Sequence, residues 1–276
     1  MDVARRIVAA SPDHPIEVLR LSSTAITTED FDRAVAHAKA SGANGFITIG
    51  GGTPIGLGKA IALDSGLPIV AIPTTYAGSE MTTIYGITEA GMKKTGRDAR
   101  VLPRTVIYDP ELTLTLPVAL SITSGINAMA HAAECLYAVD GNPIMDLLSE
   151  EGIAALARAL PVLHQKPSDI DARSDALYGA WLCGQALANA GMAIHHKLCH
   201  TLGGSFNLPH AETHTIVLPH ALAYNQHAAP DAYARMSRAL KAAEHGVSAA
   251  RRGEAEELVA LASPADAILT NWKRVP

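Results

Sequence analysis

The pattern of apolar and polar positions changes character part-way along the chain. Within residues 1–115, short apolar runs alternate with amphipathic stretches that end in glycine. Continuous or alternating apolar runs predict strands, whereas apolar residues recurring every three to four positions predict helices. Strand-like runs lie at 16–22, 45–52 and 67–75, and helical patterns lie between them at 30–42 and 55–66. This order predicts a parallel sheet with right-handed crossovers.

The rest of the chain is helical in pattern. A charged, Gly-rich hairpin and a last strand ending at Asp109–Pro110 complete the first region. The segments 118–139, 142–163 and 172–202 are alanine-rich and typical of long helices. We expect one helix to contain Asp175 to Leu202 and to end at Gly203–Gly204. The sequence therefore predicts two domains, an α/β domain over 1–115 and an α-helical domain over 116–276.

Composition narrows the class of protein. The 276 residues are 48% hydrophobic and 18% charged, with a formal net charge of -5, which indicates a globular protein without a basic surface for nucleic acid. The three cysteines form no C-x-x-C pair, so we expect reduced thiols in a cytoplasmic protein. We identify no secretory signal and no apolar run long enough to span a bilayer.

The segment "ITIGGGTPIGLGK" follows a predicted strand and opens a predicted helix. Three successive glycines let the backbone adopt positive φ and approach a ligand closely. The helix start offers free N–H groups and a positive dipole end, which suit a pyrophosphate. A tight turn without a ligand is the alternative, because the segment is neither a Rossmann nor a full Walker motif. The segment 73–82 adds hydroxyls at the end of the next strand, where open α/β sheets bind ligands. Together the two segments favour a dinucleotide.

Four histidines occur within sixteen residues, at His195, His196, His200 and His210. On one helix, His196 and His200 stand one above the other at i and i+4. The intervening "SFNLP" segment is able to return His210 toward the same face. For any one of these side chains, an ordinary core or surface histidine is the simpler interpretation.

An upstream helix adds to this group. Asn127, His131 and Glu134 share one of its faces, at i, i+4 and i+7. Imidazoles from two helices and a loop then predict a polar pocket between the domains. We interpret His195, and also His214 and His220, as ordinary structural residues.

The order of these pieces resembles the iron-containing alcohol dehydrogenase superfamily. "GGGTPIGLGK" matches its GGGS phosphate loop, and "PTTYAGSE" matches its PTT-x-G-T-G-S-E segment. "GINAMAHAAE" matches G-x-D-A-x-x-H-A-x-E, and "HHKLCHTLGGSFNLPH" matches H-x-x-x-H-x-x-G with its following histidine. We find the match over about residues 31–225. The resemblance implies a dehydroquinate synthase-like fold, with a nucleotide-binding α/β domain, a helical catalytic domain and the active site between them.

The resemblance also implies roles for individual residues. His131, His196 and His210 fall on the three histidine ligand positions of the iron enzymes, and His200 falls on the position of the proton-relaying histidine. The implied cofactor-binding residues, for NADH or NADPH, are Gly50, Gly51, Gly52, Thr53, Lys59, Thr74, Thr75 and Ser79.

Two departures from the family pattern matter. Asn127 stands where the family has an aspartate metal ligand, and Gly56 stands where its phosphate loop has an aspartate. Both are similar to the maleylacetate reductase branch, which reduces a carbon–carbon double bond in ring-cleavage products of aromatic compounds. Replacing aspartate with asparagine removes a Coulomb attraction for a cation of about several kcal/mol at intermediate dielectric. We therefore expect the imidazoles to bind a dicarboxylate substrate and its developing enolate, with no metal required.

Two alternatives stay open from the sequence. One is a metal-dependent alcohol or aldehyde oxidoreductase of the same superfamily, since three histidines alone still bind zinc. The other is an inactive relative, truncated at both ends and stable only as an oligomer or with a partner. The expectation for the active form is a cytoplasmic homodimer that binds neither nucleic acid nor membrane.

Overall fold

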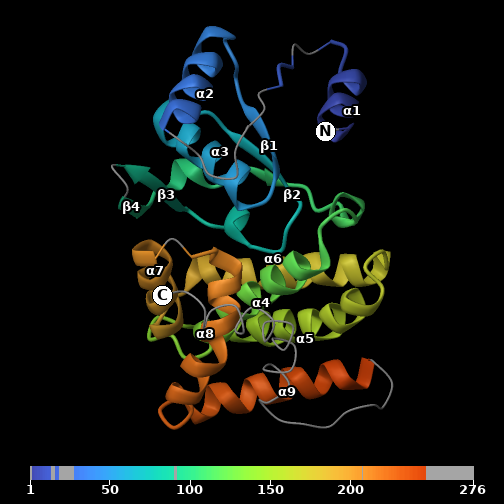
Figure 1. Ribbon diagram of the computed structural model, residues 1–276, viewed down its shortest axis with the longest axis vertical. Coiled ribbons are helices and arrows are strands. Elements are labelled where there is room, and N and C mark those ends of the chain that lie inside the picture. Colours follow the sequence, from blue (N-terminus) through green and yellow to red (C-terminus); the bar gives the residue numbers. More distant parts are fainter. Residues whose placement is uncertain (1, 14–15, 19–27, 90–91, 207, 247–276) are drawn as a thin grey trace.

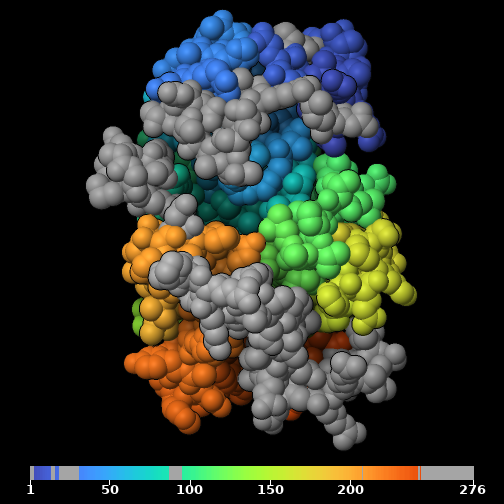
Figure 2. All heavy atoms as spheres, viewed as in Figure 1, coloured from blue at the N-terminus to red at the C-terminus, as the bar shows by residue number. Residues whose placement is uncertain are grey.

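The computed structural model describes residues 2–13, 16–18, 28–89, 92–206 and 208–246. An α/β half lies at one end of the long axis of the molecule, and a helical half lies at the other (Figure 1). With all atoms drawn, the blue-to-teal residues of the first half rest on the yellow-to-red residues of the second (Figure 2). The site predicted between the halves therefore depends on how they are joined.

A parallel sheet forms the centre of the α/β half. Its strands are β1 (Phe46–Gly50), β2 (Ile69–Pro73) and β5 (Thr105–Val106), in the order β1-β2-β5. Helix α3 (Gly52–Ser65) connects β1 to β2 and ends at Gly66, whose φ of 70° is the left-handed conformation that glycine adopts readily. The predicted parallel sheet and crossover helix are confirmed.

The remaining elements of this half surround the sheet. Helix α2 (Thr28–Ala40) packs on α3 through a small apolar cluster that includes Val35 and Leu57. The predicted hairpin is present as an antiparallel pair, β3 (Ile84–Glu89) with β4 (Met92–Arg97). The other elements of this half are α1 (Asp2–Ala10), η1 (Ser79–Met81), η2 (Ala99–Val101) and η3 (Pro110–Thr113).

Within the described residues, six helices build the second half. They are α4 (Val118–Cys135), α5 (Pro143–Gln165), α6 (Ile170–Asn189), α7 (Ile194–Phe206), α8 (His210–Asn225) and α9 (Pro230–Gly246). Small residues allow close helix packing: a Cβ atom at Gly125 of α4 would lie 2.6 Å from Leu160 of α5. Helix α4 is buried over most of its length, so its polar side chains lie inside the protein. No described helix has the length and apolar character needed to cross a membrane.

Four sequence predictions differ from the structure. The helix expected from Asp175 to Leu202 is two helices, because the chain turns after Ala190 and the N–H of Gly191 donates to Asp140 Oδ1 at 2.8 Å. Helix α7 then runs through Gly203–Gly204 to Phe206, since glycine permits a helix end without imposing one. The last strand of the sheet ends at Val106 rather than at Asp109. For the strand expected at 16–22, residues 16–18 are not in a strand and 19–22 lie outside the described residues.

Candidate active site

The glycine turn after β1 brings the two predicted cofactor segments together. Gly50 has a φ of 141°, and a Cβ there would lie 2.7 Å from Pro54 Cγ, so the turn requires glycine. A Cβ at Gly51 would lie 2.9 Å from Thr75 Cγ2, and the N–H of Thr74 donates to the Gly50 carbonyl at 3.0 Å. The loop and the segment after β2 thus lie side by side at the carboxyl ends of two parallel strands.

The start of α3 suits a phosphate group. Gly51 is the N-cap residue, and no side chain caps the helix there. A Cβ at Gly52 would meet nothing within 4 Å. An uncapped helix N-terminus with open space beside it fits the pyrophosphate of a dinucleotide, with Gly50, Gly51, Gly52 and Thr53 around it.

The second cofactor segment is anchored to the helical half. The N–H of Tyr76 donates to Ser124 Oγ at 2.8 Å, and Arg173 Nη1 donates to the Tyr76 hydroxyl at 3.0 Å. Tyr76 and Arg173 are both fully buried. Ser124 lies on α4 two turns before His131, or about 10 Å along the helix axis. The segment that carries Thr74, Thr75 and Ser79 therefore leads from the glycine turn toward the histidines.

Lys59, which was predicted to bind the cofactor, is buried and bonds to backbone carbonyls of the second cofactor segment and of β3. Lys59 is buried in α3, and its Nζ donates to the carbonyls of Ser79 at 2.6 Å, Thr82 at 2.8 Å and Ile84 at 2.8 Å. Burial lowers the pKa of Lys59 to about 7, and the charge of Glu80 opposes that change. Three carbonyl acceptors use all three ammonium donors. Lys59 therefore fixes the shape of the second cofactor segment from behind.

The four predicted imidazoles gather, as expected. The ring centroids of His131 and His196 are 4.8 Å apart, and those of His196 and His200 are 6.1 Å apart. His210, at the first residue of α8, stacks on His200 at 6.1 Å. His131 and His196 are buried and form the floor of the site. His200 and His210 are exposed and form its mouth.

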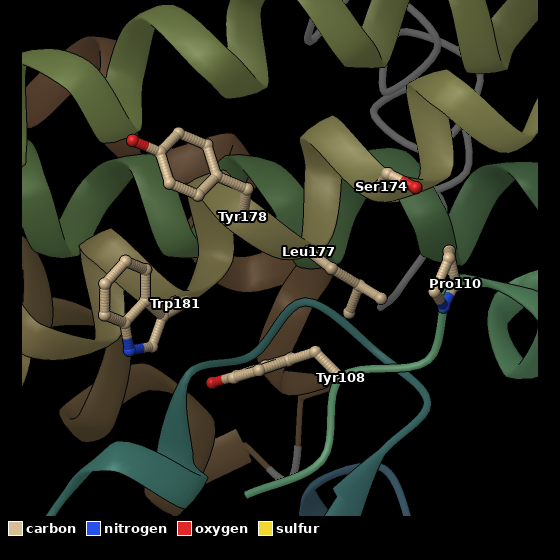
Figure 3. Close-up of a pocket in the computed structure, with 6 residues that line it drawn as sticks. All are labelled: Tyr108, Pro110, Ser174, Leu177, Tyr178 and Trp181. Atoms are coloured by element: carbon tan, nitrogen blue, oxygen red, sulfur yellow. The ribbon is translucent and has the colours of Figure 1, made fainter.

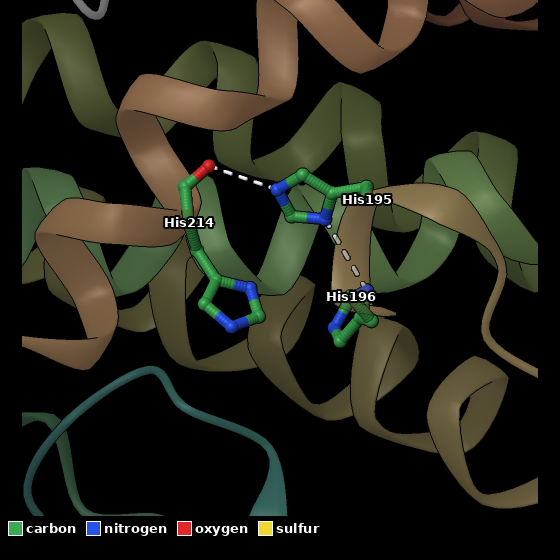
Figure 4. Close-up of side chains that lie close together, drawn as sticks. All are labelled: His195, His196 and His214. Atoms are coloured by element: carbon green, nitrogen blue, oxygen red, sulfur yellow. Dashed lines mark hydrogen bonds between the residues drawn. The ribbon is translucent and has the colours of Figure 1, made fainter. Parts of the chain in front are cut away.

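Two further histidines belong to this group. His214 lies on α8 one turn after His210, and its ring is 4.2 Å from that of His210 and 4.7 Å from that of His196. His195 Nε2 donates to the His214 carbonyl at 2.9 Å, which ties α7 to α8 (Figure 4). Both had been interpreted as ordinary structural residues, but among the described residues neither ring nitrogen of His214 has a hydrogen-bond partner. The spacing of four from His210 on a helix was the signal that could have identified it.

Glu134 organises the buried floor. Its Oε1 accepts from the N–H of His195 at 2.8 Å, and its Oε2 accepts from the N–H of Ala193 at 3.0 Å and from His196 Nδ1 at 2.7 Å. Burial favours a higher pKa for Glu134, but the hydrogen bond and charge of His196 and the backbone donors outweigh it and lower the pKa. An ionised Glu134 holds a proton on His196 Nδ1, and the other ring nitrogen, Nε2, has no partner among the described residues. Sequence reasoning placed Glu134 on this face without assigning it a role.

Unpaired polar atoms concentrate in this floor. Among the described residues, the buried side-chain atoms without a partner include Asn127 Oδ1, His131 Nδ1, His196 Nε2 and both ring nitrogens of His214. Burying such atoms unpaired costs about 1–3 kcal/mol each. Five of them on four neighbouring side chains indicate a site that a ligand completes.

Burial favours the neutral form of three of the clustered imidazoles. It is the largest cause that lowers the pKa of His131, His195 and His214, and the neighbouring imidazoles lower it further. For His195 the pKa falls to about 4. Near neutral pH these rings therefore offer one N–H donor and one lone pair each.

A cavity of about 280 Å³ lies elsewhere, where the chain leaving β5 meets α6 (Figure 3). Its lining is mainly apolar and includes Tyr108, Leu177 and Trp181. The Tyr108 hydroxyl donates to Glu80 Oε1 at 2.9 Å, which joins this wall to η1. None of the candidate histidines lines it.

Fold and site together define a class: a parallel nucleotide-binding sheet joined to a helical half with a histidine-lined site. The chain belongs to the iron-containing alcohol dehydrogenase family. The family model "iron-containing alcohol dehydrogenase" matches residues 2–110, and "Fe-containing alcohol dehydrogenase family, C-terminal" matches residues 121–268. The likeness therefore extends beyond residues 31–225, the range expected from the motifs.

Within this family, the chain is similar to maleylacetate reductases. It is 56% identical over 269 residues to the maleylacetate reductase of Burkholderia cepacia, covering 92% of this chain and 74% of that protein. The crystal structure of the maleylacetate reductase from a Rhizobium species matches with a TM-score of 0.82 at 48% identity, over 91% of this chain and 69% of that one. The enzyme of the same name from Agrobacterium tumefaciens matches with a TM-score of 0.82 at 50% identity, with the same coverage.

The family name implies a metal ion, and the donor atoms of the floor fit one through neutral ligands. His196 has its Nδ1 bound to a carboxylate and its Nε2 unpaired, which is the usual arrangement of a metal-ligating histidine. His131 and His210 are the further nitrogen ligands that the family pattern supplies. Asn127 contributes a neutral oxygen, and Glu134 is engaged by four N–H groups. The site therefore lacks the anionic ligand that strengthens binding of a divalent cation.

Proposed function

We propose that this protein is a maleylacetate reductase, which reduces the double bond of 2-maleylacetate to give 3-oxoadipate during the degradation of aromatic compounds. The observation that carries the proposal is the group of buried imidazoles near Asn127, several of whose ring nitrogens have no hydrogen-bond partner among the described residues. Such a floor offers hydrogen bonds to a dicarboxylate, and its own carboxylate, Glu134, is already engaged by four N–H groups.

The bound cofactor, NADH or NADPH, supplies the hydride. It is added to the alkene carbon β to the substrate ketone, and the electron pair of the double bond moves to the ketone oxygen as an enolate. His131, His196 and His210 bind the carboxylates and the developing enolate oxygen. His200, at the exposed mouth, delivers a proton to the α carbon and regains one from solvent. Atoms and electrons balance, because one hydride and one proton are added across one double bond.

The cofactor is held by the two segments that meet at the glycine turn. Gly50, Gly51, Gly52 and Thr53 surround the pyrophosphate at the start of α3. Thr74, Thr75 and Ser79 continue the binding surface toward the histidines. The contact between Gly51 and Thr75 and the uncapped helix N-terminus support this assignment.

We further propose that the reaction requires no metal. The substrate ketone already withdraws electrons from the double bond, and Asn127 leaves the site without its anionic ligand. A metal ion held by the histidines would polarise a carbonyl oxygen as a Lewis acid. The proposed reaction reaches the same end with hydrogen bonds from imidazoles.

One assay tests the proposal. NADH or NADPH oxidation is followed with maleylacetate, and in parallel with simple aldehydes and added iron. We expect turnover with maleylacetate that persists after treatment with a chelator. Stoichiometric, tightly bound iron or zinc, with activity lost on chelation, would contradict the metal-free proposal.

A metal-dependent alcohol or aldehyde oxidoreductase is the second candidate. The geometry of His196, with one nitrogen on Glu134 and the other unpaired, favours it. Turnover of aldehydes with iron, and none with maleylacetate, would establish this candidate. No turnover with either substrate would indicate an inactive relative.

We propose that the active form is a cytoplasmic homodimer. The three cysteines are free and buried, in agreement with a reducing compartment. Sedimentation measurements across a range of protein concentrations test the assembly, and a monomer at all concentrations would contradict it.

A further inference from the structure

His214 lies at the centre of the histidine group, and the reaction proposed above does not use it. Its side chain is 0% exposed. Its ring lies 4.2 Å from that of His210, 4.7 Å from that of His196 and 6.0 Å from that of His200. It therefore contacts both the floor and the mouth of the site.

Both ring nitrogens of His214 are buried without a hydrogen-bond partner. The backbone of the residue, in contrast, is firmly held, because its carbonyl accepts from His195 Nε2 (Figure 4). A neutral imidazole always carries one donor and one acceptor, and leaving both unpaired is costly. A fixed ring with two unsatisfied nitrogens is explained if a bound molecule reaches it.

The neighbouring rings indicate which atom of that molecule His214 meets. His196 donates its Nδ1 proton to Glu134, and its Nε2 is buried without a partner among the described residues. Asn127 Oδ1 is also an unpaired acceptor. In the part of the chain that the structure describes, no acceptor fixes the tautomer of His214, and its ring is therefore able to turn an N–H toward an oxygen atom that enters the group.

We propose that His214 is a further substrate-binding residue, which donates a hydrogen bond to an anionic oxygen of the bound dicarboxylate. The inference rests on the proposed function, since it assigns this ring a ligand of that substrate class. It places one substrate oxygen deep in the floor, between α4, α7 and α8.

Three variants separate binding from structure. His214→Leu removes both nitrogens from a side chain of similar size, and His214→Asn restores an N–H donor. His220→Gln is the matched control, because His220 lies on the same helix and is exposed. Titration calorimetry in the presence of NADH measures the affinity for adipate, a six-carbon dicarboxylate without a double bond.

We expect His214→Leu to weaken adipate binding at least tenfold and to raise the KM for maleylacetate by a similar factor, with a smaller change in kcat. His214→Asn should recover most of the loss, and His220→Gln should match the wild type. Affinity for NADH should stay within twofold in all three. Adipate affinity within twofold of wild type in His214→Leu would overturn the proposal.

A measurement on the wild-type protein covers the case in which a variant fails to fold. Two-dimensional NMR of the imidazole ¹⁵N nuclei reports the tautomer of His214, and adipate should shift its two nitrogens. Unchanged His214 signals at saturating adipate would overturn the proposal. The same follows if zinc ion alone binds stoichiometrically and shifts both the His214 and His196 nitrogens, because the ring is then a metal ligand.

The two proposals fail in different ways. An absence of maleylacetate turnover by the wild type contradicts the proposed function, while the adipate difference at His214 is still measurable. Normal turnover by the wild type, with an unchanged KM in His214→Leu, contradicts only the role of His214.

Discussion

Replacing Glu134 with glutamine should loosen the floor of the site and destabilise the fold. The two carboxylate oxygens accept from the N–H groups of Ala193, His195 and His196, from His196 Nδ1, and from the Tyr137 hydroxyl. Glutamine offers one oxygen, and its amide group then faces at least two of these donors without accepting. The change in volume is small, so the effect comes from hydrogen bonds and charge.

The size of the effect follows from that count. Hydrogen bonds to a charged group contribute about 1.5–3 kcal/mol each, so two lost bonds cost about 3–6 kcal/mol. The free energy of unfolding of a domain is about 5–15 kcal/mol, so this loss is a large share of the total stability. Thermal unfolding should move down by roughly 10 °C or more. The KM for maleylacetate should also rise, because Glu134 fixes the tautomer of His196.

Denaturant unfolding and steady-state kinetics check this prediction, with Glu151→Gln as the control. Glu151 is a partly exposed partner of Arg158 on α5, and its loss should cost at most about 1 kcal/mol. Unfolding free energies of Glu134→Gln and wild type that agree within about 1 kcal/mol would refute the reasoning, since about 3 kcal/mol is its lower bound.

The same carboxylate predicts a dependence on pH. The folded-state pKa of Glu134 is lowered from the ordinary value of 4.5 for a glutamate side chain. Its contribution to stability is therefore fully present above the unfolded-state pKa and is lost as the pH falls through the folded-state value. The difference in unfolding free energy between wild type and Glu134→Gln should shrink below about pH 4. A difference that stays constant down to about pH 2 would contradict the assigned ionisation.

Three further changes test other parts of the site. Asn127→Asp should tighten divalent-metal binding by about two orders of magnitude and should weaken dicarboxylate binding. Metal titration and the KM for maleylacetate measure these two effects. An unchanged metal affinity would contradict the role given to Asn127. Tyr76→Phe should leave Arg173 short of one hydrogen bond and raise the KM for the nicotinamide cofactor several-fold, and an unaltered KM would mean that the anchor does not position the cofactor segment. Gly184→Ala would place a Cβ 3.0 Å from the Gly78 carbonyl oxygen and should destabilise the fold by about 1–3 kcal/mol in denaturant unfolding, whereas wild-type stability would show that the contact relaxes freely.

Local sequence patterns predicted most of the framework. The glycine ends of α2 and α3, the parallel order of β1 and β2, and the helical second half all follow from periodicity and caps. The break between α6 and α7 could not be predicted in this way. It depends on a hydrogen bond from the Gly191 N–H to Asp140, which lies fifty-one residues earlier in the chain. No local rule identifies such a contact.

The candidate site, too, was predicted only in part from local sequence patterns. Helical spacing predicted that His131, His196, His200 and His210 meet, and they do. The amine of Lys59 was assigned from a linear motif, but its direction is set by the carbonyls of η1 and β3, which only the folded chain brings near. His214 was within reach of the spacing argument, and its importance became visible only through its unpaired nitrogens.

The anchoring of Tyr76 has a mechanical consequence. The buried guanidinium of Arg173 on α6 donates to the Tyr76 hydroxyl, and the Tyr76 N–H donates to Ser124 on α4. Lys59 on α3 donates to the Ser79 carbonyl of the same segment. Swinging the two halves apart would break the hydrogen bonds from Tyr76 to Ser124 and from Arg173 to the Tyr76 hydroxyl. We therefore expect the molecule to turn over as a single rigid block, with nucleotides entering and leaving past side chains at its rim.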